Sequence, residues 1–146
     1  MVGHYFRSFD DKKRLVLPAK FRKDLGDVVY ATYGPDMVLE LRSAKAFESL
    51  RERLLSNNML NKTLRKYARV LFGNTVELNA DKLGRVNMPD EIINLASIKK
   101  EVAFVGVGDK VEIWNKDEFQ KFQSTTTTEG SLDELAEALF KEGVEI

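Results

Sequence analysis

A nine-residue segment that occurs twice constrains the fold of this chain more than any other feature. Residues 10–18 (DDKKRLVLP) and 81–89 (DKLGRVNMP) both contain Asp, three residues, Arg, three mainly apolar residues and Pro. A single Asp-x-x-x-Arg segment occurs by chance in many proteins, so one copy carries little weight. Two copies with the same apolar continuation and the same Pro indicate an internal duplication.

The similarity between the two halves continues beyond this segment. Phe21 and Ile92 keep the 71-residue spacing of the motif, and after one inserted residue the spacing becomes 72, so that Glu40 matches Glu112. Each half is predicted to fold as strand, charged turn, strand, short helix after the Pro, strand, strand and helix. Ser43 and its counterpart Asn115 precede the helices that end the two halves, and both residue types cap helix N-termini.

The two charged turns differ at one position that matters for the backbone. Gly84 can adopt a positive φ in the second turn, whereas the first turn has Lys13 at the same place. Either the first turn has another backbone shape, or Lys13 adopts a strained left-handed conformation.

Composition excludes several classes of protein. The 146 residues are 43% hydrophobic, which suffices for a core, and they include no cysteine and one histidine. No run of about 18 apolar residues is present, so no membrane span is expected, and the N-terminal residues lack the apolar segment of a signal peptide. Without cysteine, disulfides and thiolate metal sites are excluded. A cytoplasmic location is the simplest expectation.

The net charge of zero hides an asymmetry between the halves. Residues 1–75 carry fifteen Lys and Arg against eight Asp and Glu, and residues 76–146 carry eight against fifteen. The first half is therefore the better candidate for contact with a polyanion. Taken alone, the asymmetry favours charges that merely solvate the surface and pair between the halves, and it gains weight only beside the repeated motif.

Helices are predicted between and after the two halves. Residues 43–56 and 63–72 have the periodicity of two amphipathic helices, and the second should turn Leu64, Tyr67, Ala68 and Leu71 inward. Residues 124–128 form a polar, Thr-rich linker before an acidic amphipathic helix with Leu132, Leu135, Leu139 and Phe140 as its apolar stripe. The stripe could pack on its own domain, pack on a neighbouring subunit or stay mobile.

A half of about 45 residues buries little core and is marginal alone. Two such halves can interleave their strands and share one core, which predicts a small closed β-barrel carrying helices. The pseudo-twofold relation would bring the two Asp-x-x-x-Arg turns to comparable positions on that barrel.

The paired motif and the helical hairpin between its copies resemble the MraZ family over roughly residues 1–122. The resemblance implies an α+β fold, a pseudo-twofold swapped-hairpin (double-split) β-barrel of two AbrB-like repeats with helices between and after them. The corresponding parts are AbrB-like module 1 at 5–47, a helical hairpin linker at 48–74, AbrB-like module 2 at 76–119, and the Thr-rich linker with the C-terminal helix at 124–146.

The resemblance also implies a function. Members of this family are bacterial transcriptional regulators that form ring-shaped homo-oligomers. They bind repeated elements in double-stranded DNA upstream of cell-division and cell-wall genes, so the chain is expected to be cytoplasmic and nucleoid-associated. The family usually has Gly where this chain has Lys13, which adds a positive charge to the first turn.

Arg14 is the main candidate for DNA contact, because a guanidinium offers a planar donor fork that fits guanine and phosphate. An exposed ion pair with Asp10 would contribute only about 0–1 kcal/mol, which makes stabilisation alone a weak reason for the motif. Lys12 and Lys13 suit phosphates. In the second copy, base contact and structural pairing are equally plausible. The DNA-binding candidates are Asp10, Lys12, Lys13, Arg14, Asp81, Lys82 and Arg85, with Arg7 and Arg22 bordering the same surface.

Two other functions compete with DNA binding. An antitoxin-like protein-binding module could use the acidic C-terminal helix behind its linker. An enzyme is poorly supported, because the sequence has no cysteine, a single histidine, no phosphate-binding glycine loop and no paired metal-ligand spacing. We therefore expect no catalytic residue, metal, cofactor or small-molecule substrate.

Overall fold

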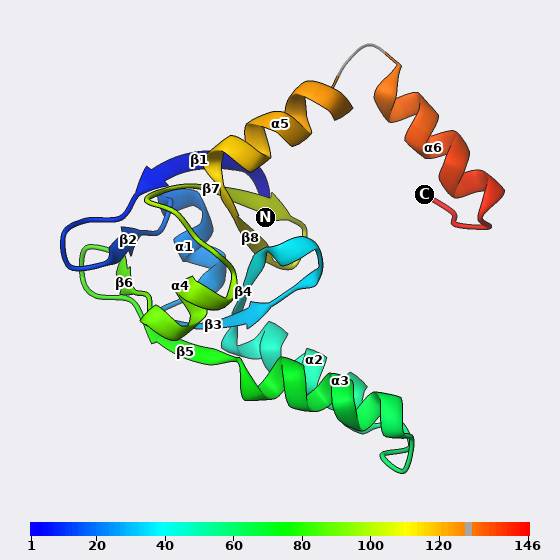
Figure 1. The fold of residues 1–146 in the computed structure, drawn as a ribbon, viewed down its shortest axis with the longest axis horizontal. Coiled ribbons are helices and arrows are strands. Elements are labelled where there is room, and N and C mark those ends of the chain that lie inside the picture. The colour runs from blue at the N-terminus through cyan, green and yellow to red at the C-terminus, as the bar shows by residue number, and fades with distance from the viewer. Residues whose placement is uncertain (128–129) are drawn as a thin grey trace. The chain divides into compact units, whose positions relative to one another are not determined.

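The computed structural model describes residues 1–127 and 130–146, and the described chain divides into two compact units. The first unit, Met1–Asn115, contains every described strand, and the second, Lys116–Ile146, contains two helices (Figure 1). Both copies of the repeated motif therefore lie in the first unit.

The first repeat forms four strands and a short helix before helix α2. Strands β1 and β2 flank the turn that begins at Asp10, and α1 follows Pro18 as predicted. β4 begins only at Leu39, because Asp36 and Met37 have φ angles of 63° and 65° and belong to a 3-10 turn. The elements are β1 (Val2–Ser8), β2 (Arg14–Val16), α1 (Ala19–Leu25), β3 (Val28–Tyr33), η1 (Pro35–Met37) and β4 (Leu39–Ser43).

The second repeat gives the same order of elements. Pro89 precedes α4 as Pro18 precedes α1. Phe21 of α1 and Ile92 of α4, which are counterparts at the 71-residue offset, are both buried. The elements are β5 (Val76–Asn79), β6 (Arg85–Asn87), α4 (Asp90–Leu95), β7 (Glu101–Val107) and β8 (Val111–Asn115).

Of the two predicted helix caps, one is confirmed and one is wrong. The Ser43 hydroxyl accepts a hydrogen bond from the Ala46 N–H at 3.1 Å and so caps α2 (Ala44–Leu55). The Asn115 side chain instead accepts from the Lys99 N–H at 2.6 Å and donates to the Ser97 carbonyl at 2.9 Å. Asn115, at the end of β8, therefore holds the loop before β7, in which Ser97 has a positive φ of 52°.

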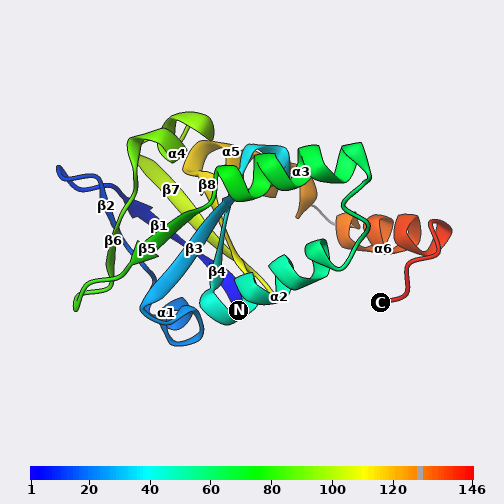
Figure 2. The same cartoon turned by 90° about the horizontal axis from the view of Figure 1, so that it is seen from below.

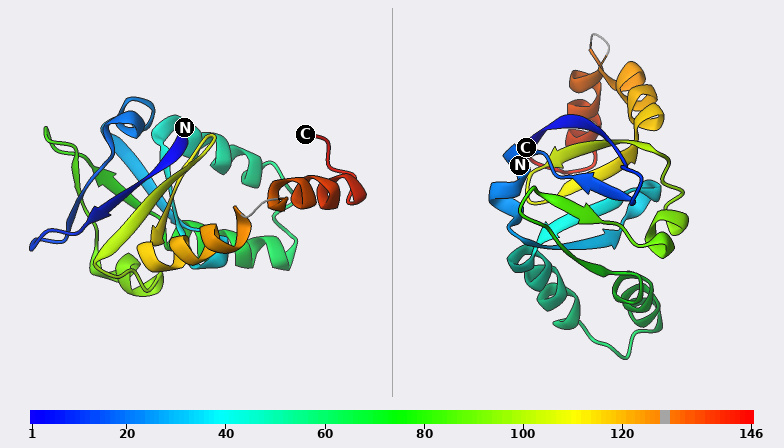
Figure 3. Two further views of the ribbon diagram at one scale, coloured as in Figure 1. Left: turned by 90° about the horizontal axis from the view of Figure 1, so that it is seen from above. Right: turned by 90° about the vertical axis from the view of Figure 1, so that its left-hand side faces the viewer.

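Strands of the two repeats alternate in space. The larger sheet has six antiparallel strands in the order β1-β7-β8-β4-β3-β5, and β2 pairs with β6 in a separate two-stranded ribbon (Figures 2 and 3). β1 of the first repeat thus lies beside β7 of the second, and β5 of the second lies beside β3 of the first. The α+β class and the interleaving of two repeats are confirmed. That the strands form a swapped-hairpin, closed β-barrel stays a prediction.

The strand register has the symmetry that the duplication predicts. Leu15 lies opposite its counterpart Val86 in the ribbon, and Glu40 lies opposite its counterpart Glu112 in the sheet. On either side of each pair the partners exchange, so that Leu39 faces Ile113 and Leu41 faces Val111. A pseudo-twofold axis therefore passes through both pairs, and the 71- and 72-residue offsets of the sequence are the correct alignment.

One apolar core joins both repeats. Its members are buried residues from the sheet, the ribbon and the two short helices, and the largest are the aromatic side chains of Phe21 and Phe104. A buried ionic cluster lies on the other face of the sheet, because Glu40 and Arg42 alternate with the core residues Leu39 and Leu41 along β4. Glu40 accepts from Arg42 at 3.0 Å and from Lys110 at 2.7 Å. The Arg42 guanidinium also donates to the Thr32 hydroxyl at 3.0 Å, so the buried charges are satisfied.

Helices α2 and α3 (Lys62–Gly73) form the predicted helical hairpin, at the end of the first unit away from the β2–β6 ribbon (Figures 1 and 2). Phe47 anchors the hairpin, because its ring stacks on Tyr30 of β3 at 4.4 Å and meets Phe72 edge-on at 6.2 Å. Ala68 and Leu71 are buried as predicted, but Tyr67 is 54% exposed. The prediction that Tyr67 points inward is wrong, since only a narrow face of α3 packs against α2 and the sheet.

The second unit consists of α5 (Lys116–Thr126) and α6 (Ser131–Lys141). The linker expected from Ser124 begins later, because Ser124, Thr125 and Thr126 donate their hydroxyl protons to carbonyls one turn earlier and continue α5. Thr128, at the end of the expected linker, lies outside the described residues. The predicted amphipathic C-terminal helix is confirmed as α6.

Candidate nucleic-acid interface

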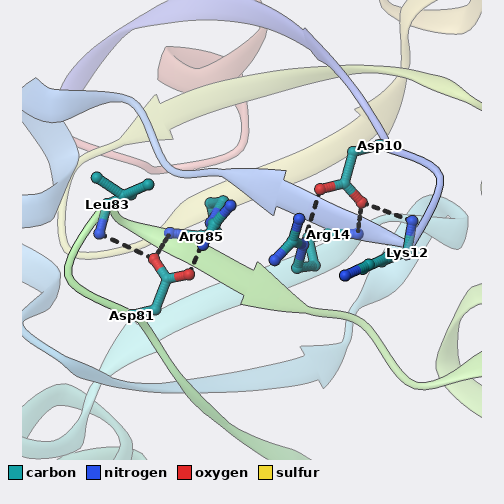
Figure 4. A network of polar contacts seen from close by, with 6 residues as sticks. All are labelled: Asp10, Lys12, Arg14, Asp81, Leu83 and Arg85. Carbon is teal, nitrogen blue, oxygen red and sulfur yellow. Dashed lines mark hydrogen bonds and ion pairs between the residues drawn. The ribbon is translucent and has the colours of Figure 1, made fainter.

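The β2–β6 ribbon presents one apolar and one polar face. Leu15 and Val86 form the central pair and are fully buried against the core. Because side chains alternate along a strand, Arg14 and Arg85 point to the opposite face. Arg14 lies directly opposite Asn87, and Arg85 lies directly opposite Val16. Figure 4 shows the two Asp–Arg pairs on this ribbon, one from each repeat. The ribbon therefore carries two arginines on its outer face.

Asp10 organises the first turn through both carboxylate oxygens. Oδ1 accepts hydrogen bonds from the N–H groups of Lys12 and Arg14, both at 2.9 Å, and Oδ2 accepts from the Arg14 Nε at 2.8 Å. The backbone closes the same turn, since the Asp10 N–H donates to the Arg14 carbonyl at 3.0 Å. One side chain thus fixes the loop and aims the arginine (Figure 4).

The second turn repeats this network atom for atom. Asp81 accepts from the N–H groups of Leu83 and Arg85 at 2.9 Å and from the Arg85 Nε at 2.6 Å. The Asp81 N–H donates to the Arg85 carbonyl at 3.0 Å. The Asp-x-x-x-Arg spacing is therefore a structural unit, in which the carboxylate can reach both the backbone and the side chain of the arginine four residues on.

Both carboxylates are held in the ionised form. The pKa of Asp10 lies below its ordinary value of 3.8, chiefly because its carboxylate accepts a hydrogen bond from the Arg14 N–H. The Arg14 side chain and the Lys12 N–H lower this pKa further, and desolvation opposes them. The Arg85 N–H and side chain lower the pKa of Asp81 in the same way. The two acceptors are therefore charged throughout the physiological range.

The arginines keep their outer nitrogens available. Each uses Nε for its aspartate, and within residues 1–127 and 130–146 the Nη1 and Nη2 groups of Arg14 and Arg85 have no hydrogen-bond partner. The two side chains are 28% and 29% exposed. Each guanidinium is consequently fixed at its base and presents a two-nitrogen fork, the geometry that binds the acceptor pair of a guanine edge or a phosphate.

The lysines of the turns are exposed. Lys13 has a φ of 59°, so of the two alternatives the left-handed conformation is the one adopted, and its Nζ pairs with Asp90 at the start of α4. Lys12 lies at the tip of the first turn, and Lys82 lies in the second. Lys12 and Lys82 are exposed cations in the two turns, whereas Lys13 is exposed but ion-paired with Asp90. Contacts of these lysines to phosphates stay a prediction.

Arg7 and Arg22 take separate positions. Arg7 donates to the Phe6 carbonyl at 2.8 Å and lies over the Tyr5 ring at 5.9 Å, so its guanidinium is held along β1. Arg22 of α1 packs against the second turn, where a Cβ on Gly84 would lie 2.5 Å from its guanidinium carbon. The strand exchange explains this placement, because each short helix lies beside the turn of the other repeat.

Two exposed apolar residues of this surface were not anticipated. Leu83 occupies the position of Lys12 at the tip of the second turn and is 64% exposed, and Val16 lies directly opposite Arg85 and is 43% exposed. The repeat alignment could have identified Leu83, since it places a leucine where the first copy has a loop lysine. An exposed leucine in a turn suits contact with an apolar group such as the thymine methyl.

No cluster of three or more His, Asp and Glu side chains suitable for a metal ion is found among residues 1–127 and 130–146. In the same part of the chain, none of the helices combines the length and the apolar character needed to cross a bilayer.

Two interleaved repeats, each with an aspartate-clamped arginine on a shared β-ribbon, define a duplicated β-ribbon protein with a charged outer surface. The comparison with known families also finds two repeats: the family model described as "MraZ protein, putative antitoxin-like" matches residues 1–70 and again residues 71–142. The chain belongs to the MraZ family. The two matches begin at residues 1 and 71, a separation within one residue of the 71-residue offset of the sequence repeat.

The similarity to individual relatives extends over nearly the whole chain. A protein called transcriptional regulator MraZ from Mycoplasma mobile is 41% identical to this chain over 98% of both sequences. The protein of the same name from Mycoplasmopsis pulmonis is also 41% identical, over 99% of this chain and 98% of its own length. The protein of the same name from Caldanaerobacter subterraneus is 34% identical over 95% of this chain and 96% of its own length.

Proposed function

We propose that this protein is a DNA-binding transcriptional regulator that places its β2–β6 ribbon in the major groove. The observation that carries the proposal is the pair of arginines on the outer ribbon face, each clamped at Nε and open at Nη1 and Nη2. A two-stranded ribbon fits the width of the major groove, and an arginine fork is the commonest specific partner of guanine. The names of the relatives support regulation of transcription.

In this proposal the residues of the turns have separate tasks. Arg14 and Arg85 contact base edges, while Lys12, Lys13 and Lys82 contact phosphates and set the position of the ribbon. Asp10 and Asp81 do not touch DNA, because they would repel phosphates; they hold the arginines. Arg7 borders this surface as an additional positive charge.

We further propose that several copies act together as a ring. One ribbon contacts few base pairs, so a homo-oligomer that engages successive repeated elements would gain its affinity from multivalency. The proposed target is the promoter region of the cell-division and cell-wall gene cluster, which makes the protein cytoplasmic and nucleoid-associated.

The test is a gel-shift titration with a duplex from the region upstream of the protein's own gene. Arg14→Ala should weaken binding by about tenfold to a hundredfold, since a guanine–arginine pair contributes about 1–3 kcal/mol. Arg51→Ala is the matched control, because it removes one exposed arginine from α2, at the end of the first unit away from the ribbon. Equal binding by both variants would refute the role of the ribbon.

A second candidate is an antitoxin-like module that binds another protein. The family description and the exposed apolar residues of α6 favour it. A stoichiometric partner that co-purifies with the full chain and is lost on deletion of residues 124–146 would support this function instead.

A further inference from the structure

An open apolar groove runs between the two helices of the hairpin. It has a volume of about 470 Å³ and is lined almost wholly by apolar atoms, although two arginines stand at its edge. Arg65 is held by the Met59 and Leu60 carbonyls at 3.1 and 2.7 Å, whereas Arg69 has no partner among the described residues. We call this surface the α2–α3 groove; it is lined by Leu55, Met59, Arg65, Ala68, Arg69, Phe72 and Gly73.

Helix α6 carries an apolar face that its own unit leaves uncovered. Leu132, Leu135 and Phe140 are 79%, 53% and 81% exposed, and with the half-buried Leu139 they form one stripe at helical spacing. We call these four residues the α6 stripe. An exposed stripe of this kind on a three-turn helix is typical of a helix that binds in a groove of another surface.

The groove and the stripe are complementary in charge. Residues 44–73, which form the hairpin, contain seven Lys and Arg against two Glu, and residues 131–146 contain five Asp and Glu against one Lys. Asp133 and Glu142 flank the stripe on its two sides by helical spacing and would face the arginines at the rim of the groove. Apolar contact at the centre with opposite charges at the rim is the usual anatomy of a specific interface.

We infer that the α2–α3 groove of one copy binds the α6 stripe of a second copy of this chain. The inference rests on the part of the proposed function in which copies associate, and not on the DNA contacts. Helices α2 and α3, which line the groove, lie at the end of the first unit away from the β2–β6 ribbon (Figures 1 and 2), so a copy that holds DNA can still receive a helix.

The strand directions favour a second copy over the same chain. β4 and β8 are antiparallel, with Leu39 opposite Ile113 and Leu41 opposite Val111. The hairpin starts after Ser43 at one end of this strand pair, and the chain leaves the first unit after Asn115 at the other end. A head-to-tail exchange of α6 between neighbours is heterologous, which is the kind of contact that builds a closed ring.

Site-directed disulfides test the inference, because the chain has no native cysteine. Full-length Leu55→Cys is mixed with full-length Leu135→Cys under mild oxidation, and the cross-linked heterodimer is measured by mass. Glu134→Cys is the matched control, since this residue is adjacent to Leu135 and exposed but lies outside the stripe. The groove–stripe pair should cross-link at least about tenfold faster than the control pair, as expected for residues held in one interface.

Each other outcome overturns the inference. Equal rates for Leu135→Cys and Glu134→Cys would show that the stripe does not enter the groove. A chain with both Leu55→Cys and Leu135→Cys that forms an intrachain disulfide independently of protein concentration would show that α6 occupies its own groove.

The two proposals can fail separately. Sedimentation of the unmodified protein as a monomer would refute the ring and the inference together, whereas an oligomer that Leu135→Asp leaves unchanged would refute only the inference. Arg14→Ala should leave the cross-linking rate unchanged, because the ribbon takes no part in this contact.

Discussion

Glu40 and Glu112 lie directly opposite each other on β4 and β8, although like charges in that position destabilise a sheet. The two residues are counterparts, yet they are satisfied differently. Glu40 accepts from Arg42 and Lys110, and Glu112 accepts from the Trp114 indole N–H at 3.1 Å. Trp114 is itself the counterpart of Arg42, so both repeats place a donor at the same position, charged in the first and neutral in the second.

This difference predicts unequal effects on stability. Glu40→Gln should lower the free energy of unfolding by about 3–5 kcal/mol, because it leaves the Arg42 guanidinium buried without its counter-charge. Glu112→Gln is the control and should cost less than about 1 kcal/mol, since a glutamine oxygen still accepts from Trp114. Urea unfolding followed by circular dichroism at one fixed protein concentration measures both, and equal losses would contradict the prediction.

The turns should respond to acid. Asp10 has a pKa lowered below 3.8 in the folded chain, so its contribution to stability is fully present above its unfolded pKa and is lost as the pH falls through the lower, folded pKa. The carboxyl carbon of Asp10 should therefore titrate below 3.8 by NMR. The stability difference between the unmodified chain and Asp10→Asn should shrink below that pH; a titration at or above 3.8 would exclude the observed hydrogen bonds in solution.

Much of this structure followed from the sequence because a repeat supplies its own alignment. The 71- and 72-residue offsets predicted the equivalent strands, both short helices and the interleaving, and the strand register agrees with them at Leu15 and Val86. The offsets could not predict Tyr67 or Asn115, since periodicity does not say how wide a helix face is covered and a capping residue can bond a neighbouring loop instead.

The candidate site was only partly predictable. The motif identified Asp10 and Arg14, but that the aspartate would take Nε and leave the outer nitrogens open is a matter of rotamer and distance. Arg22 shows the other limit: its position beside Gly84 depends on strand exchange between the repeats, a relation in space that no local pattern encodes.

Lys13 and Gly84 make a matched pair for testing the turns. Lys13→Gly should raise the free energy of unfolding by up to about 1 kcal/mol, because glycine adopts the φ of 59° without strain. Gly84→Ala should lower it by about 1 kcal/mol or more, since a side chain at φ 77° is strained and its Cβ would displace the Arg22 guanidinium. Thermal unfolding of the two variants checks the signs, and a loss of stability in Lys13→Gly would show that the ion pair with Asp90 outweighs the strain.

The identity of the cation at position 14 separates base recognition from general attraction to DNA. Arg14→Lys keeps the positive charge but loses the planar fork, so affinity for the repeated elements should fall about tenfold while affinity for an unrelated duplex stays the same. The slope of log affinity against log salt should change little, because the number of phosphate contacts is preserved. Lys12→Arg is the control that keeps charge in the same turn and should leave the ratio of specific to non-specific binding unchanged. If Arg14→Lys also preserves that ratio, Arg14 contacts phosphate, and the selection of bases must then come from Arg85 or Leu83, whose alanine variants would lower it instead.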